Sequence, residues 1–261
     1  MSGILLREER DGIVTLTMND PRTLNALSDA MLAALAKAFD GIAESGARVV
    51  VLRGEGRAFC AGHHLREMQA MRAHEDGGRA AFADLFDRCA AVMARIRALP
   101  QPVIARVHGL ATAAGCQLVA TCDLAVAAEE AEFGVNGVDI GLFCSTPMVA
   151  LTRNVGRKRA FEMLSTGMFL SAGEAVAAGL VNRAVPSGAL DDCVDHYART
   201  VAEKLPGAVR IGKGVFHAQA ELPVEEAYAL ARDAMVENLS AAETAEGIQA
   251  FLEKRAPRWT Q

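Results

Sequence analysis

Apolar residues follow two different spacings along the first half of the chain. Segments with alternating or continuous apolar residues, rich in β-branched side chains, predict strands. These segments are residues 12–18, 47–56, 102–109 and 123–128. Segments with apolar residues three and four positions apart predict helices. These segments are residues 27–45, 79–100 and 114–122. Such alternation of strand and helix through about residue 130 is typical of parallel βαβ units.

Two of the predicted helices carry end signals. Ser28 is expected to cap the helix over 27–45, because a serine side chain accepts a hydrogen bond from a free N–H of the first turn. Pro100 is expected to end the helix over 79–100. The apolar face of that second helix is predicted to hold Phe82, Phe86, Cys89, Met93 and Ile96.

From residue 146 onward the pattern becomes mostly helical. The expected helices are 147–155, 157–166, 171–178, 190–205, 223–237 and 240–254. Pro206 with Gly207, and the pair Gly212 and Gly214, are expected to interrupt the helical pattern. We therefore predict a core over residues 1–200 and a C-terminal helical module over residues 201–261.

Composition is that of an ordinary globular protein, with 51% hydrophobic and 23% charged residues. A length of 261 residues suits one large α/β domain, with or without an appendage. The formal net charge is −5 and no basic stripe is present, so nucleic acid is not an expected partner. The chain has no apolar run of membrane-spanning length and no leader pattern, so we expect no membrane partner and a cytoplasmic location.

Cysteine usage indicates neither a disulfide framework nor a metal site. None of the six cysteines forms a CxxC pair, so we expect small buried hydrophobic residues in a reducing compartment. These cysteines are Cys60, Cys89, Cys116, Cys122, Cys144 and Cys193.

Two segments of small residues lie between a predicted strand and a predicted helix: "FCAGHHL" (59–65) and "AAGCQLVATCD" (113–123). Small side chains at a helix N-terminus let a ligand approach its free N–H groups, where the helix dipole favours negative charge. Two such turns at the ends of adjacent parallel strands would form an oxyanion hole. Close packing of helix on sheet also requires small residues, so these segments alone leave both interpretations open.

Six motifs, in order, resemble the crotonase, or enoyl-CoA hydratase/isomerase, superfamily over essentially the whole chain. They are "PRTLNALS" (21–28), "GRAFCAGHHLREM" (56–68), "HGLATAAGCQLVATCD" (108–123), "FGVNGVDIGL" (133–142), "RAFEMLSTGMFLSAGEAVAAGLVNRAVP" (159–186) and "AFLEKRAP" (250–257). Among subfamilies, "AGHHL", "AAGCQLVATCD" and "GLFCSTPMVAL" look most like the enoyl-CoA hydratase domain-containing 3 group.

The resemblance implies an α/β fold, a spiral of ββα repeats followed by C-terminal helices that join subunits into trimers or dimers of trimers. It implies an acyl-CoA thioester as substrate, with no cofactor beyond the CoA moiety of that substrate and no metal. Its oxyanion hole maps onto the backbone N–H groups of His63 and Ala114. The family position matching Ala114 is usually Gly, and an alanine keeps the N–H.

Three positions depart from the family pattern. Gln117 and Gly137 stand where family hydratases carry the two glutamates that add water, and Ser145 stands where other members carry a carboxylate. Since a general acid or base contributes about 10²–10⁴ in rate, hydration here would need another proton-transfer group. Gln117 is able to orient water, or it is simply a half-buried amide that satisfies nearby backbone groups.

Few residues offer a substitute. Asp139 is one candidate, although on an extended segment its side chain would face away from Gly137. His63 and His64 lie on the oxyanion loop and are either a base that works near neutral pH or a solvent-facing pair. Ser145 would need a nearby base to act as a nucleophile, and is better interpreted as a helix cap or a site-lining hydroxyl.

The resemblance also places the CoA contacts. Arginine or lysine would meet the diphosphate, an aromatic side chain would pack on adenine or pantetheine, and backbone groups of the first loop would meet adenine. The matching residues are Arg22, Arg66 and Lys254, then Phe251, then Cys60 and Ala61. Each of the three cations is alternatively an ordinary surface residue, and Phe251 a core aromatic.

Three functions remain open. The first is a hydratase or isomerase of acyl-CoA thioesters, and the second is thioester hydrolysis or decarboxylation, which needs the oxyanion hole but not the glutamates. The third is a non-catalytic acyl-CoA-binding protein.

Overall fold

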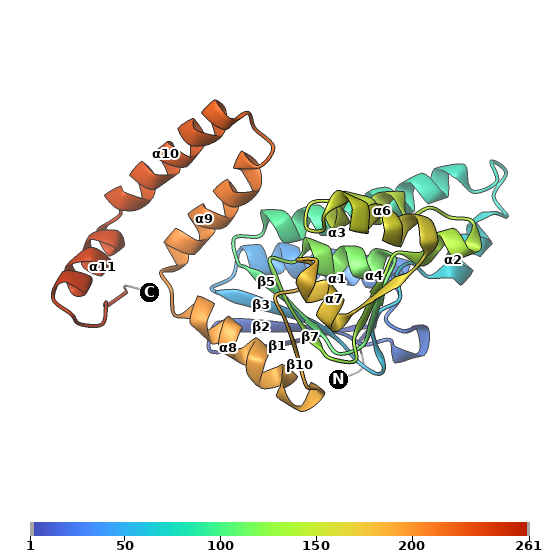
Figure 1. The fold of residues 1–261 in the computed structure, drawn as a ribbon, viewed down its shortest axis with the longest axis horizontal. Coiled ribbons are helices and arrows are strands. Elements are labelled where there is room, and N and C mark those ends of the chain that lie inside the picture. The colour runs from blue at the N-terminus through green and yellow to red at the C-terminus, as the bar shows by residue number, and fades with distance from the viewer. Residues whose placement is uncertain (1–2, 260–261) are drawn as a thin grey trace.

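The computed structural model describes residues 3–259, so the outermost residues of the two predicted modules, 1–2 and 260–261, lie outside the described part. A six-stranded sheet forms the base of the molecule, with strand order β1-β2-β3-β5-β7-β10 (Figure 1). β1 and β2 form an antiparallel hairpin and the remaining neighbours are parallel. The strands are β1 Leu5–Arg10, β2 Ile13–Met18, β3 Val49–Gly54, β5 Val103–Val107, β7 Leu124–Ala128 and β10 Arg183–Val185.

A second sheet is built from four strands of three residues each. These strands are β4 Ala58–Cys60, β6 Leu110–Thr112, β8 Glu132–Gly134 and β9 Phe169–Ser171, in the order β4-β6-β8-β9. The chain repeatedly passes from a strand of the large sheet to the next strand of the small sheet and then into a helical segment. β3 leads to β4, β5 leads to β6, and β7 leads to β8, which is the spiral of ββα repeats that the family resemblance implied.

Helices cover the two sheets and follow the predicted periodicity closely. Ser28 caps α1 (Asp29–Ala43) by accepting a hydrogen bond from the Met31 N–H, as predicted. α3 (Arg79–Ala98) ends before Pro100, also as predicted, but its buried face differs in part. Leu85 and Val92 are buried there, whereas Phe82 and Phe86 are only partly buried.

The remaining helical elements of the core are short. They are η1 Pro21–Thr23, α2 Leu65–Met71, α4 Ala114–Thr121, η2 Asn136–Ile140, α5 Ser145–Leu151, α6 Arg157–Thr166, α7 Ala172–Ala177 and η3 Ser187–Ala189. Within the described residues, no helix is both long enough and apolar enough to cross a membrane.

Both faces of the large sheet are buried, because helices cover each of them. Val50 and Leu52 of β3 contribute to the main core beneath α1 and α3, whereas Val49 and Val51 belong to a second cluster. That second cluster packs against α8 (Leu190–Ala202), which covers the opposite face of the sheet. Burial on both faces explains why β3 reads as a continuous apolar run rather than as an alternating one.

The last three helices extend from this core as an arm (Figure 1). The arm consists of α9 (Pro206–Gln219), α10 (Val224–Ser240) and α11 (Ala242–Leu252). The expected break at Pro206 is confirmed, because α8 ends at Ala202 and α9 begins at Pro206, but the expected interruption at Gly212 and Gly214 is wrong. Pro206 occupies the first turn of α9, where a missing N–H costs nothing, and α9 continues through both glycines.

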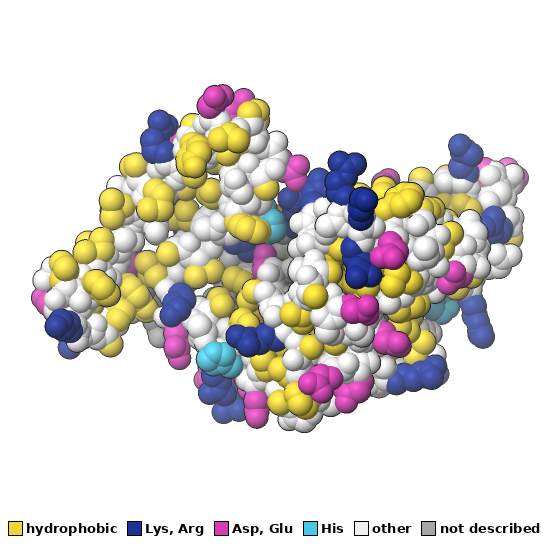
Figure 2. Space-filling view, viewed as in Figure 1, with side chains coloured by type: hydrophobic (Ala, Val, Ile, Leu, Met, Phe, Trp, Pro, Cys, Tyr) yellow, Lys and Arg dark blue, Asp and Glu magenta, His cyan; other side chains and the backbone are white. Residues whose placement is uncertain are grey.

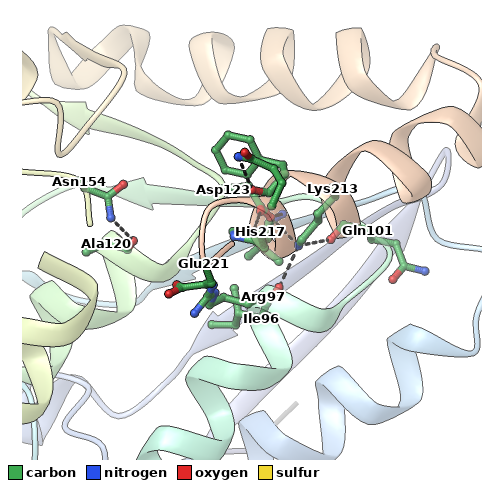
Figure 3. A network of polar contacts seen from close by, with 12 residues as sticks. Ile96, Arg97, Gln101, Ala120, Asp123, Asn154, Lys213, His217 and Glu221 are labelled. Atoms are coloured by element: carbon green, nitrogen blue, oxygen red, sulfur yellow. Dashed lines mark hydrogen bonds and ion pairs between the residues drawn. The ribbon is translucent and has the colours of Figure 1, made fainter. Parts of the chain in front are cut away.

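A buried ion pair joins the root of the arm to the core (Figure 3). The Lys213 ammonium of α9 donates hydrogen bonds to the Ile96 carbonyl at 2.8 Å, the Gln101 carbonyl at 3.0 Å and the Asp123 carboxylate at 2.6 Å. The His217 Nε2 lies 3.2 Å from the other oxygen of Asp123. Burial lowers the pKa of Lys213, and the Asp123 charge opposes that effect.

Candidate functional site

The first small-residue turn connects β4 to α2. Gly62 adopts a φ of +86°, a left-handed conformation that glycine accepts without strain. The Leu27 N–H donates to the Gly62 carbonyl at 2.7 Å, and the Ala61 N–H donates to the Leu24 carbonyl at 3.0 Å. The segment 21–28 therefore holds this turn in place from one side.

Asn25 fixes the segment 21–28, a role that no sequence pattern indicated. Its side chain is fully buried, donates to the Glu55 and Ala58 carbonyls at 2.8 Å each, and accepts from the Asp20 N–H at 2.9 Å. Its φ of 54° lies in the left-handed region, which asparagine tolerates better than most residues. The available signal was the residue type, since asparagine accepts a left-handed backbone conformation more readily than most residues.

The second turn connects β6 to α4. Ala113 has φ 50° and ψ −120°, a conformation that costs an alanine on the order of 1–3 kcal/mol. The Ala113 N–H donates to the Gly134 carbonyl at 2.9 Å, and α4 begins at Ala114. Gly115 follows, and any side chain there would collide with the Cys60 carbonyl. Small residues at this helix start thus serve close packing as well as access to the N–H groups.

The two turns are in direct contact. A Cβ atom on Gly62 would lie 2.9 Å from the Ala113 Cβ and 3.1 Å from the Ala114 nitrogen. Neither the His63 N–H nor the Ala114 N–H donates a hydrogen bond to another described residue. Two unpaired backbone donors therefore stand side by side, one of them at the positive end of α4, which is the arrangement of an oxyanion hole.

Side chains next to these donors also lack partners. Both ring nitrogens of His63 and the Oε1 of Gln117 are enclosed and make no hydrogen bond to the described part of the chain. The His63 ring packs edge-on against Phe86, with centroids 5.5 Å apart. Burial lowers the pKa of His63; the Leu27 carbonyl, which lies near the ring but outside hydrogen-bonding geometry, opposes this effect, and the Arg88 charge reinforces it. The imidazole is therefore neutral at pH 7.

His64 is a structural residue rather than a solvent-facing one. Its Nδ1 accepts a hydrogen bond from the Glu67 N–H at 3.3 Å and so caps α2. The Glu67 carboxylate in turn accepts from the Asp29 N–H at 2.9 Å at the start of α1. This chain of contacts fixes the direction in which α2 leaves the first turn.

Gly137 has no room for a side chain. It is buried in η2, and a Cβ there would lie 2.8 Å from the Cys144 Sγ and closer still to the Leu142 carbonyl oxygen. A carboxylate at this position would require the backbone to move. Cys144 fills the space beside Gly137, and burial raises the pKa of its thiol.

The expectation that Asp139 lies on an extended segment is wrong, because η2 is a 3-10 helix. Its carboxylate is exposed and lies against Gly167, at the end of α6, with the Asn136 amide 3.4 Å away. Ser145 is also exposed and is the first residue of α5, whereas Cys144 occupies the cap position. The Ser145 hydroxyl lies 3.4 Å from the Phe143 carbonyl.

The residues assigned to CoA divide into two groups. Arg22, with 95% of its side chain exposed, and the exposed Arg66 lie on the core near the first turn. Phe251, which is 82% exposed, and Lys254 lie at the far end of the arm. Figure 1 shows α11 on the opposite side of the molecule from α2, so one chain does not bring the two groups together.

Backbone groups of the first loop are largely engaged. The Cys60 carbonyl packs against Gly115, and the Ala61 N–H is bonded to Leu24. Burial raises the pKa of the Cys60 thiol to about 12, so the side chain stays protonated and unreactive. Across residues 3–259, no group of three or more His, Cys, Asp or Glu side chains is arranged to hold a metal ion.

Comparison with known proteins agrees with the motifs. The sequence model of the enoyl-CoA hydratase/isomerase family matches residues 8–261. The chain belongs to the enoyl-CoA hydratase/isomerase family. It is 44% identical over 253 residues to the mitochondrial enoyl-CoA hydratase domain-containing protein 3 of the rat, which covers 97% of this chain and 83% of the rat protein.

Solved structures of the family share the whole fold. A structure of enoyl-CoA hydratase from Mycobacterium smegmatis superposes with a TM-score of 0.95 at 53% identity, covering 99% of each chain. Human enoyl-CoA hydratase domain-containing protein 3 superposes with a TM-score of 0.93 at 44% identity, covering 98% of this chain and 99% of the human chain. The crotonase-type α/β spiral with C-terminal helices is thereby confirmed.

Proposed function

We propose that this protein binds an acyl-CoA thioester with its carbonyl oxygen between the backbone N–H groups of His63 and Ala114. The contact between the two turns, with both donors unpaired, is the observation that carries this proposal. Donors aimed at a developing negative charge favour any reaction through an enolate or a tetrahedral intermediate, and each contributes about 10²–10³ in rate.

The reaction that we favour is of the hydratase or isomerase type. Family membership supports it, and the amide at Gln117 and the missing side chain at Gly137 argue against the usual pair of glutamates. Ser145 is exposed, and among the described residues its hydroxyl is hydrogen-bonded only to the Phe143 carbonyl, which does not activate it as a nucleophile. Thioester hydrolysis or decarboxylation is the alternative, since each uses the oxyanion hole alone, and binding without turnover is the third possibility.

CoA would be held by two subunits. Arg22, Arg66 and the loop at Cys60 and Ala61 would contribute from one chain, while Phe251 and Lys254 would reach the ligand from a neighbour. Figure 2 shows hydrophobic side chains gathered over the arm, and several large apolar residues of that surface are exposed. They include Phe216, Tyr228, Met235, Leu239, Phe251 and Leu252.

These exposed apolar residues support the proposal that residues 201–261 form an oligomerisation module, giving a homotrimer or a dimer of trimers. We further propose that the protein works in the cytoplasm without a metal or a cofactor other than the CoA moiety of its substrate. Its vertebrate relatives carry the word mitochondrial in their names.

The binding proposal is tested by calorimetry with butyryl-CoA on the wild type and two alanine variants. Gly62→Ala would push the two turns apart and should weaken binding at least about tenfold. Gly12→Ala introduces the same positive-φ strain in the β1–β2 turn, where the nearest atoms are 3.4 Å away or more, and should leave binding intact. Equal affinities for the two variants would contradict the assignment of the hole.

Turnover is tested by following the loss of the enoyl absorbance of crotonyl-CoA, with Gln117→Glu measured beside the wild type. Gly137→Glu is unsuitable, because the Leu142 carbonyl and Cys144 leave it no space. Hydration by the wild type would establish the hydratase reaction and a substitute proton-transfer group. Binding without hydration would direct the search to thioester cleavage, decarboxylation or plain binding.

A further inference from the structure

Six enclosed side-chain nitrogen or oxygen atoms in the described residues lack a hydrogen-bond partner, and three of them border the oxyanion hole. These three are the two ring nitrogens of His63 and the Oε1 of Gln117. The other three are scattered over Gln101, His108 and Thr244. Buried polar atoms are nearly always hydrogen-bonded, so a concentration of unpaired atoms at one place indicates a bound group that supplies the missing partners.

Both side chains belong to the residues that build the hole. His63 contributes one of the two backbone donors, so its imidazole is fixed within a few bonds of that donor. Gln117 lies three positions after Ala114 on α4, which places it on the same side of the helix one turn later. Because Cβ bonds tilt toward a helix N-terminus, the Gln117 side chain leans back toward the hole.

The chemistry of these atoms favours a neutral hydrogen-bonding group. A neutral imidazole has one donor and one acceptor nitrogen, and the amide oxygen of Gln117 is an acceptor. A hydroxyl both donates and accepts, so it satisfies this set. A carboxylate only accepts, and Arg88, whose charge acts on His63, is already paired with Asp29 and Asp84 at 2.9 and 2.7 Å.

We propose that the site selects acyl-CoA thioesters that carry a hydroxyl on C2, the carbon next to the thioester carbonyl, and that His63 and Gln117 bind that hydroxyl. The position follows from His63, which holds the carbonyl oxygen with its N–H and reaches the substituent with its ring. C2 is the acyl carbon next to the carbonyl carbon and the nearest one that is able to carry a hydroxyl. This inference rests on the proposed binding of an acyl-CoA in the hole.

The test compares butyryl-CoA, 2-hydroxybutyryl-CoA and 3-hydroxybutyryl-CoA by calorimetry, each hydroxyacyl thioester as separate enantiomers. We expect one enantiomer of 2-hydroxybutyryl-CoA to bind the wild type about tenfold more tightly than butyryl-CoA. Its hydroxyl would supply hydrogen-bond partners to the buried polar atoms of His63 and Gln117, which butyryl-CoA leaves unpaired. In His63→Leu and in Gln117→Met, this ratio should fall to within about twofold. Both substitutions retain the backbone N–H groups.

Matched controls separate this role from a structural one. Gln101→Met removes another buried amide with an unpaired Oε1, and His108→Leu removes a partly buried histidine with an unpaired Nδ1; neither residue belongs to the two turns. Both should keep the tenfold ratio. If His63→Leu does not fold, as judged by thermal melting, Gln117→Met still decides the outcome.

Each outcome has one meaning. Equal binding of butyryl-CoA and both hydroxybutyryl thioesters would overturn the inference while leaving the proposed function intact. A preference for 3-hydroxybutyryl-CoA would overturn the assignment to C2. A ratio unchanged in both site variants would remove His63 and Gln117 from recognition. Binding of none of the three thioesters would overturn the proposed function itself.

Discussion

The core buries its large apolar side chains, whereas the arm exposes many of its own to solvent. In the core, the apolar stripe of α1 is buried beneath the sheets, and Phe39 is 1% exposed. In the arm, α10 has no buried residue at all, α9 buries Lys213 and α11 buries Ala250. Large apolar side chains such as Tyr228 and Phe251 are more than two thirds exposed there.

This difference shows where the stability of each region originates. The core is stabilised by its own apolar burial. The arm gains little from burial within the chain and is attached at its root by the hydrogen bonds of Lys213 to the core. An open cleft of about 1460 Å³ lies between the core and part of the arm, with Arg48 on one wall and Glu237 on the other. The exposed apolar surface of the arm is available to a second copy of the chain, as proposed above.

The sharpest test makes the same substitution in both regions. Phe39→Ala should reduce the free energy of unfolding by about 3–5 kcal/mol, because it leaves a cavity in the core. Phe251→Ala should change the free energy of unfolding of an isolated subunit by less than about 0.5 kcal/mol. Urea titration measures both effects, and sedimentation at several concentrations shows whether Phe251→Ala shifts the protein toward smaller species. Similar losses of stability for the two variants would contradict the contrast.

Breaking the join between the regions should have the next largest effect. Lys213→Met leaves the Asp123 carboxylate mostly buried without its ammonium partner, which should cost about 3 kcal/mol in the free energy of unfolding. Lys37→Met, on the exposed face of α1, is the matched control and should cost less than about 0.5 kcal/mol.

A second variant distinguishes the cost of an unpaired buried charge from the cost of altered packing at the contact between arm and core. Lys213→Met combined with Asp123→Asn removes both charges and should recover part of the loss, as measured by the same urea titration. A loss below about 1 kcal/mol in the single variant would show that other contacts hold the arm.

The smallest effect is a difference in acid response between the regions. Burial lowers the pKa of His63 and His108 in the core, so the unfolded chain binds more protons below its histidine pKa. Their contribution is present above about pH 6.5 and is lost as the pH falls through the lowered folded values. In the arm, Arg255 lowers the pKa of Glu246 to about 2. The contribution of this pair to stability is therefore complete above about pH 4.5 and is lost only as the pH falls below that value.

Hydrogen exchange followed against pH separates the two responses. Core amides should lose protection before those of α11, and His63→Leu should flatten the core response as the pH falls below about 6.5. Loss of protection in α11 before the core would show that the two windows are assigned to the wrong regions.

Sequence periodicity predicted most of the regular elements because each had a long, regular apolar pattern. Helices α1, α3 and α6 and strands β2, β3 and β5 lie where the spacing placed them. The small sheet was not predicted from periodicity, because a strand of three residues is too short to show an alternating apolar pattern. α9 was missed because Pro206, Gly212 and Gly214 are breakers by propensity, whereas tertiary contacts of Lys213 hold that helix.

The same division holds for the candidate site. Motifs placed the two turns, Gln117 and Gly137, and the turns meet in the structure. No sequence pattern indicated that Gly137 lacks room for a side chain. The obstructing carbonyl belongs to Leu142, which reaches Gly137 only because the chain folds back after η2. Asn25 likewise acts through the Glu55 and Ala58 carbonyls, which are distant from it in sequence.

The sequence by itself determined the family, the order of strands and helices, and the residue types at the hole, because these depend on local periodicity and on motifs that are contiguous in the chain. The tertiary structure alone decided that the two turns touch, that the polar atoms of His63 and Gln117 are left without partners, and that Lys213 joins arm to core. Each of these depends on atoms that are far apart in sequence and become neighbours only when burial forces every polar group to find a partner or to remain without one.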